Sequence, residues 1–338
     1  MWYALPIVRF SNAIVGLVGF IVGYMIGASE ERQSDLPTGV GNAESQQRFI
    51  SSHADFLREH HKIHLLLTKT FIRPLARPSE EGIEGLPDDD PAVIAFENKI
   101  IANRLIFYLG RAAADDFGEL LVLSGNGYGI GALKILRGMY ERMVTAAFLA
   151  KNPSEARIFA ENDVIQKWKL WREHVEIMPE LEDRYTEEQK KEFEERYKAI
   201  RAKRKEEECP KCRQPKTQEA WTRVTMKDMA KQADSGLAQI YVKAYLEPTF
   251  QSHATSYGLG TRLLDTEEGG HTFNDTTEKE ARDAVFYGHN LILRLLGFQN
   301  GYFDLGLEAE IQERIAMFPK IWRRGGGGHD QGSDSIEK

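Results

Sequence analysis

Histidines at helical spacing are the first candidates for chemistry in this sequence. His53, His60 and His64 are separated by seven and four residues, so they lie on one stripe of a helix. His60 and His64 have the spacing that lets two imidazoles share one metal ion. A complete site needs more ligands, and Asp55 and Glu59 are displaced around the helix from that stripe. The pattern predicts either a metal site, and with it a metal-dependent enzyme, or a solvated helix face.

The cysteines form a second candidate metal site. Cys209 and Cys212 are spaced like half of a zinc ribbon, but the chain has no other cysteine. A four-thiolate zinc site would therefore need two copies of the chain, and a redox dithiol usually accompanies a βαβ unit, which this sequence does not predict. The remaining interpretation is a pair of inert thiols. Two cysteines in 338 residues also exclude a disulfide-stapled scaffold.

Arg282 and His289 suggest a third chemistry, the cleavage of RNA. The two residues share one face of a predicted helix, and this arrangement resembles the motif of the HEPN ribonucleases, which are all-helical and dimeric. The resemblance implies that His289 would act on the proton of a ribose hydroxyl and that Arg282 would stabilise the phosphorane. Similar spacings occur at other places, so spacing alone does not select this pair; they are Arg48–His53, Arg58–His64 and Arg324–His329.

A polar pair interrupts the most apolar helical segment. Residues 128–151 are apolar almost all round, which predicts a helix buried on most sides. Arg137 and Glu141 lie one turn apart on it. If they face the interior, they form a polar pocket in which Arg137 binds an anion, because a buried charge needs a partner. His253 is the third candidate for this pocket. If the stripe faces solvent, Arg137 and Glu141 are a structural pair.

The N-terminal segment predicts attachment to a membrane. Residues 10–28 carry no charge and span about 28 Å as a helix, close to the thickness of a bilayer core. We expect residues 1–28 to form a transmembrane anchor; the alternatives are a cleaved signal peptide and a buried helix. Gly19, Gly23 and Gly27 form a stripe of small residues, which predicts a homodimer through close packing of two such helices.

The flanks of this segment carry similar numbers of cations, so the positive-inside rule does not fix its orientation. We expect a single-pass protein of the cell membrane with its main domain in the cytoplasm. The chain carries 44 basic and 51 acidic residues, a net charge of −7, which argues against a surface built for nucleic acid. No cofactor is implied by the sequence, since no Gly-rich phosphate loop or dinucleotide fingerprint is present.

The elements that must position these residues are helices. A polar linker over 29–43 precedes a helical domain over 44–320, and a low-complexity tail follows over 321–338. Periodic apolar residues and Pro or Gly breaks predict the helices; they cover about 44–73, 91–124, 128–151, a segment that starts near 155 and carries Trp168 and Trp171, 180–208, 225–233, 236–247, 249–263, 277–296 and 305–318. No alternating run predicts a strand, so we expect an all-α, multi-helix bundle.

The middle of the chain resembles a known family. The segment GRAAADDFGELLVLSGNGYGIGALKILRGMYE, then FLAKNPSEARIFAENDV and the later YLEPTFQSHATSYG, is similar to the bacterial helical proteins catalogued as domain of unknown function 5677. The resemblance covers about residues 95–300 and implies an all-helical domain without an established activity. We therefore expect a binding, scaffold or sensory module. The alternatives are the ribonuclease using Arg282 and His289 and the metal-dependent enzyme using the histidine stripe.

Overall fold

The computed structural model of the protein describes residues 43–72, 78–180, 185–204, 206–208, 215–217, 220–267, 269–274 and 277–324. They belong to one compact unit that begins at Ala43. The expected anchor with Gly19, Gly23 and Gly27, the expected linker before Ala43, the cysteines Cys209 and Cys212, and the residues after Arg324 lie outside the described residues. Among the helices that are described, none is long and apolar enough to span a membrane.

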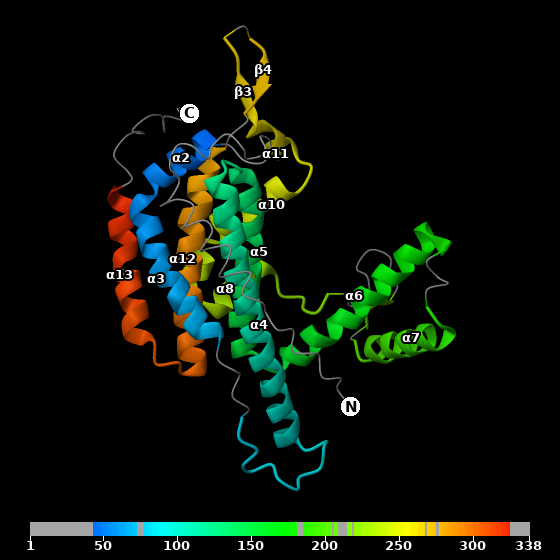
Figure 1. The fold of residues 1–338 in the computed structure, drawn as a ribbon. Helices are drawn as coiled ribbons and strands as arrows, with labels where there is room; N and C mark the ends of the chain where they lie inside the picture. Colours follow the sequence, from blue (N-terminus) through cyan, green and yellow to red (C-terminus); the bar gives the residue numbers. More distant parts are fainter. Residues whose placement is uncertain are drawn as a thin grey trace, which may run out of the picture. The chain divides into compact units, whose positions relative to one another are not determined.

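The expected all-α class is confirmed (Figure 1). The helices are α2 (Ala43–Ser52), α3 (Ala54–Phe71), α4 (Pro91–Gly125), α5 (Gly129–Lys151), α6 (Glu155–Ile177), α7 (Glu187–Ala202), α8 (Met226–Ala233), α9 (Ser235–Gln239), the π-helical turn η3 (Val242–Leu246), α10 (Glu247–Ser252), α11 (Ser256–Gly260), α12 (Glu278–Phe303) and α13 (Glu308–Arg324). The strands of the described chain are β1 (Glu206–Glu208), β2 (Pro215–Thr217), β3 (Leu263–Asp265) and β4 (His271–Phe273), which form two antiparallel hairpins.

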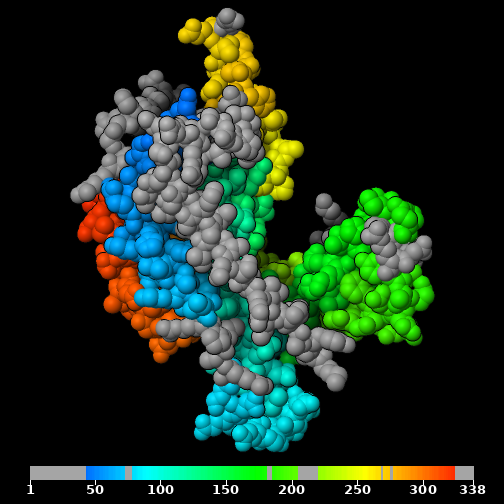
Figure 2. Space-filling model, viewed as in Figure 1, coloured from blue at the N-terminus to red at the C-terminus, as the bar shows by residue number. Residues whose placement is uncertain are grey.

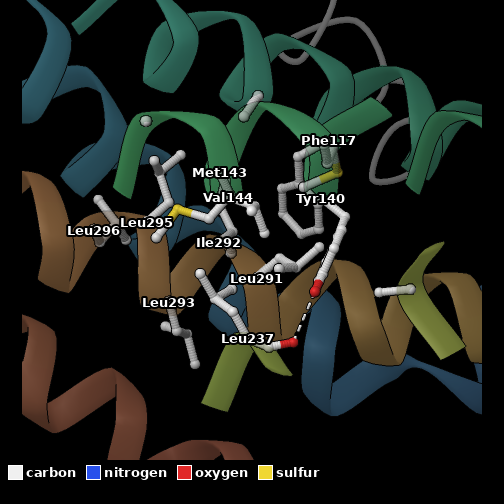
Figure 3. Close-up of a cluster of buried hydrophobic side chains, with 14 of the residues drawn as sticks. Phe117, Tyr140, Met143, Val144, Leu237, Leu291, Ile292, Leu293, Leu295 and Leu296 are labelled. Atoms are coloured by element: carbon white, nitrogen blue, oxygen red, sulfur yellow. Dashed lines mark hydrogen bonds between the residues drawn. The ribbon is translucent and has the colours of Figure 1, made fainter. Parts of the chain in front are cut away.

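Helices α4, α5 and α12 pack against one another and form the centre of the bundle (Figure 1). Buried side chains surround most of α5, as its sequence predicts. The apolar cluster in Figure 3 combines side chains of several helices, among them Phe117, Met143, Val144, Leu291, Ile292, Leu295 and Leu296. Each such side chain contributes about 1.5–3 kcal/mol when fully buried. The buried Tyr140 hydroxyl donates a hydrogen bond of 2.9 Å to the Leu237 carbonyl, which offsets its loss of water.

The turn between α4 and α5 fixes the start of α12. Gly127 has φ 80°, a left-handed conformation that favours glycine. A Cβ atom on Gly129 would collide with the backbone of Thr277 and Ala281, so only glycine allows this close approach. The Thr277 amide donates to the Gly127 carbonyl at 3.0 Å, and its hydroxyl accepts from the Ile130 amide at 3.1 Å. The first turn of α12 is therefore held firmly against the α4–α5 turn.

The expected helix over 44–73 is two helices, because the backbone leaves helical geometry at His53 (φ −115°, ψ 20°). Helix α13 packs on α3 and α12, and the atoms of α3 and α13 meet along one side of the space-filling view (Figure 2). A buried ion pair joins the two helices: the side chains of Glu59 and Arg314 are only 6% and 4% exposed. His53 at the break and Trp322 near the end of α13 also lie close together, with ring centroids 6.0 Å apart.

Other boundaries also differ from the sequence prediction. The expected helix over 180–208 contains α7, which ends at Ala202, and the strand β1, and α12 continues to Phe303, beyond the expected end near 296. The two helices expected over 236–247 and 249–263 are instead four short helical segments, α9, η3, α10 and α11, followed by β3. Helices α9, α10 and α11 each contain a Gly or Pro residue. Strands β3 and β4 were not expected; they pair Leu263 with Phe273 around a turn in which Gly269 has φ 81°. Helix α13 continues to Arg324, so the first residues of the expected tail over 321–338 are helical.

Candidate functional site

A cavity of about 650 Å³ lies where α2 and the start of α3 meet the start of α12, the end of α13 and the α4–α5 turn. Four cationic side chains and two carboxylates line it; they are Arg48, Arg58, Lys279 and Arg282, and Asp55 and Glu278. The cavity therefore carries two positive charges in excess, in a chain whose net charge is −7. Such a local excess attracts small anions, because concave walls focus the field.

The carboxylates hold two of the cations at the rim of the cavity. Arg48 Nε lies 2.5 Å from Glu278 Oε1, and this ion pair connects α2 with α12. Arg58 forms an ion pair with Asp55 on its own helix. Both arginines are well exposed, so water screens each pair and either arginine can exchange its carboxylate for another anion.

Lys279 and Arg282 occupy the first two turns of α12. The helix dipole places partial positive charge at this end, so cations here are unfavourable for the helix itself. An anion in the cavity would be stabilised both by the dipole and by the two side chains. Carboxylates on the same turns, Glu278, Glu280 and Asp283, offset part of this charge, and an anion in the cavity would offset more of it.

The inner wall of the cavity is polar at one point and aromatic at others. The Ser124 side chain is 2% exposed, and its hydroxyl has no hydrogen-bond partner among the described residues. The rings of Phe49 and His53 are stacked with centroids 4.4 Å apart, and Trp322 meets His53 edge-on at 6.0 Å. Burial lowers the pKa of His53 and the nearby Arg282 lowers it further, so the ring is neutral at pH 7.

His289 lies behind this wall and not in the cavity. Its side chain is fully buried (0% exposed), and Trp322 Nε1 donates to its Nδ1 at 3.1 Å. Burial lowers the pKa of His289 to about 3, so the ring is neutral and its proton sits on Nε2, which has no partner among the described groups. Arg282 lines the cavity while His289 is covered by Trp322. The two side chains thus do not present a ribonuclease pair to a substrate in this conformation.

The structure brings His60 and His289 into one buried cluster, although the sequence assigned them to different chemistries. Both rings contact Phe56, with centroids 5.9 and 5.2 Å away. Burial lowers the pKa of His60 to about 4. The His64 ring lies next to the His60 ring, with the two centroids 6.4 Å apart. Within the described part of the chain no three His, Cys, Asp or Glu side chains are placed to hold a metal ion. The histidine stripe is therefore mostly a packing surface.

Arg137, Glu141 and His253 do not line this cavity. Arg137 Nε donates to Glu141 Oε1 at 3.0 Å, and their side chains are 24% and 37% exposed. The Arg137 guanidinium also stands 5.4 Å from the centre of the Tyr245 ring. His253 is exposed at the end of α10. The pair is a half-exposed surface ion pair, and among the described contacts none joins it to His253.

The comparisons with known proteins concern the central helices. Residues 104–271 match the family described as "Family of unknown function (DUF5677)". The resemblance expected from the sequence is thereby confirmed. Searches of the curated proteins and of the solved structures gave no match. The DUF5677 region runs from α4 to the first residue of β4, so it contributes Ser124 to the cavity, whereas the four cations come from the segments that flank it.

Sequence reasoning missed most of this cavity. Arg48 and Arg58 appeared only as arginines spaced from a histidine like the Arg282–His289 pair, Lys279 was not singled out, and Trp322 was placed in the tail. One signal was available in the sequence: Lys279 and Arg282 lie at the start of a helix, where the helix dipole makes cations unfavourable. The contribution of Ser124 and Trp322 depends on helix packing, which a single sequence does not give.

Proposed function

We propose that this protein is a membrane-anchored binding module whose helical domain takes up a small anionic ligand in the cavity beside α12. The observation that carries the proposal is the excess of cations in one cavity of an acidic protein, two of them at the N-terminal end of a long helix. The accessible groups there are four cations, two carboxylates and hydroxyls, and the cations and hydroxyls can bind and orient an anion. The buried His289 supplies no proton transfer at this surface.

The membrane anchor is part of the same proposal. The uncharged residues 10–28 and the small-residue stripe of Gly19, Gly23 and Gly27 support a single span that pairs with a second copy. We propose in addition that the binding domain lies on the cytoplasmic side. The intact chain should stay with the membrane fraction after carbonate extraction. Recovery of the intact chain in the carbonate supernatant would contradict the anchor and leave the cavity proposal standing.

The binding proposal is tested by calorimetric titration of the full chain, in mild detergent, with inorganic pyrophosphate. We expect saturable binding that weakens as salt is added, since ionic contacts are screened. The double variant Lys279→Ala/Arg282→Ala should bind at least tenfold more weakly, because each charge-assisted hydrogen bond contributes about 1.5–3 kcal/mol.

The matched control for this experiment is Arg172→Ala/Lys227→Ala. It also removes one arginine and one lysine, both exposed, from α6 and α8, and neither lines the cavity. The control should bind pyrophosphate like the unaltered chain. An equal loss of affinity in both double variants would reflect net charge alone and would refute the proposed site, as would absence of any binding.

A further inference from the structure

Building on the proposed function, we infer that the anionic ligand also carries a planar aromatic ring, so that a mononucleotide is the class of ligand that the cavity fits. Three features of the described residues support this: the size of the cavity, its aromatic wall, and an unpartnered hydroxyl beneath it.

The cavity is much larger than a bare oxyanion needs. Its volume of about 650 Å³ lies within the range of about 300–1,000 Å³ that is typical of pockets for whole organic ligands. The cations gather on α2, α3 and the start of α12, and they account for the anionic end of a ligand. The remaining volume would have to be filled by the rest of the molecule.

The aromatic side chains indicate what fills that remainder. His53 is stacked on Phe49 at an interplanar angle of 24°, and the Trp322 ring stands at 71° to His53. Trp322 cannot turn freely, because its indole N–H is bound to the buried Nδ1 of His289. A ring that is fixed before the ligand arrives loses little entropy on binding. Neutral and cationic ligands with rings would also stack here, but an anionic ligand gains the attraction of the excess positive charge as well.

Ser124 supplies the third feature. Ser124 lines the cavity, but its hydroxyl is itself covered and lacks a hydrogen-bond partner in the described part of the chain, so a rotation of this side chain is needed to offer it to a ligand. A buried hydroxyl without a partner is costly, and a ligand that carries sugar hydroxyls or ring nitrogens would remove the cost. A phosphate, a sugar and a base together match the cations, the Ser124 hydroxyl and the aromatic wall.

The test is a calorimetric comparison of probes on the full chain in mild detergent: pyrophosphate and the diphosphates of adenosine, guanosine, cytidine and uridine. We expect at least one nucleotide to bind tenfold or more tightly than pyrophosphate, the gain that stacking on an aromatic side chain gives. If all four bind no more tightly than pyrophosphate, the inference is overturned while the proposed function stands. If a nucleotide binds the Lys279→Ala/Arg282→Ala variant unchanged, both fail.

Variants of the wall separate stacking from general structure. Trp322→Leu should lose about tenfold in nucleotide affinity and leave pyrophosphate affinity unchanged, Trp322→Phe should keep most of both, and the distant Trp171→Leu should change neither. Equal weakening of both probes by Trp322→Leu would show a merely structural role and overturn the inference. If circular dichroism shows that Trp322→Leu does not fold, His53→Leu replaces it, with the same expected pattern and the same refuting result.

Discussion

Two buried histidines make the stability of the helical domain sensitive to mild acid. His289 is fully buried and His60 packs beside it against Phe56. Burial lowers the pKa of His60 to about 4 and that of His289 to about 3, whereas each is about 6.5 in the unfolded chain. Between pH 6.5 and about 4 the unfolded chain therefore binds protons that the folded domain does not. The folded domain therefore keeps its full stability above pH 6.5 and loses stability as the pH falls from 6.5 toward 4.

The size of the effect follows from this difference. From pH 6.5 to pH 5 each histidine costs about 2 kcal/mol of unfolding free energy, at about 1.4 kcal/mol per pH unit, so the pair costs about 4 kcal/mol. Asp116 acts in the opposite direction, because burial raises its pKa to about 6 and the folded state then takes up a proton first. Protonation of Asp116 in the folded state therefore offsets about 1 kcal/mol of this loss of unfolding free energy at pH 5. The net loss expected between pH 7 and pH 5 is about 3 kcal/mol.

The assay is urea unfolding of a fragment with residues 43–338, the compact unit, followed by circular dichroism at pH 7 and pH 5. His289→Phe and His60→Phe should each reduce the pH-dependent loss by about 2 kcal/mol, whatever their effect at pH 7. His174→Gln, which replaces an exposed histidine on α6, is the matched control and should leave the loss unchanged. The reasoning is refuted if the unaltered fragment is as stable at pH 5 as at pH 7, or if the control behaves like the two buried variants.

Three further predictions concern stability, each measured as a change in unfolding free energy in urea. Glu59→Ala should cost about 3 kcal/mol, because it removes the buried partner of Arg314 and leaves this cation only its ion pair with the exposed Glu313. Replacing Glu59 with leucine and Arg314 with methionine should recover the lost stability, and a cost near zero for Glu59→Ala would contradict the buried pair. Glu141→Ala should cost less than about 1 kcal/mol, since its ion pair is half-exposed, and a larger loss would place that pair in the interior. Gly129→Ala should cost about 1–3 kcal/mol through overlap with the α12 backbone, whereas Gly118→Ala, which meets open space, should be neutral or stabilising; equal effects would rule out the close approach.

The helices of this protein could be predicted from local sequence patterns. Several helix ends could not, because different local signals conflict there. The apolar circumference of α5 and the Pro91 start of α4 were readable because spacing and backbone chemistry agree there. The break at His53 was not, since the apolar spacing continues through it. The end of α13 was misplaced because the glycines after Arg324 suggested an earlier tail.

The candidate site was only partly readable, because it is made by contacts between distant segments. The sequence identified Arg282 and His289 as a pair, but it could not show that Trp322 separates them, forty and thirty-three residues along the chain from each. Likewise it gave His60 and His289 different roles, although α3 and α12 bury them together. Periodicity reports which residues share a helix face and not which helix covers that face.

The most direct test of the cavity proposal is a crystal structure of residues 43–338 grown with pyrophosphate. We expect the anion to lie within hydrogen-bond distance of Lys279 and Arg282 at the start of α12, with Arg48 turned toward it. Pyrophosphate bound only on another surface, or a cavity without the anion at concentrations that saturate the calorimetric titration, would contradict the proposal.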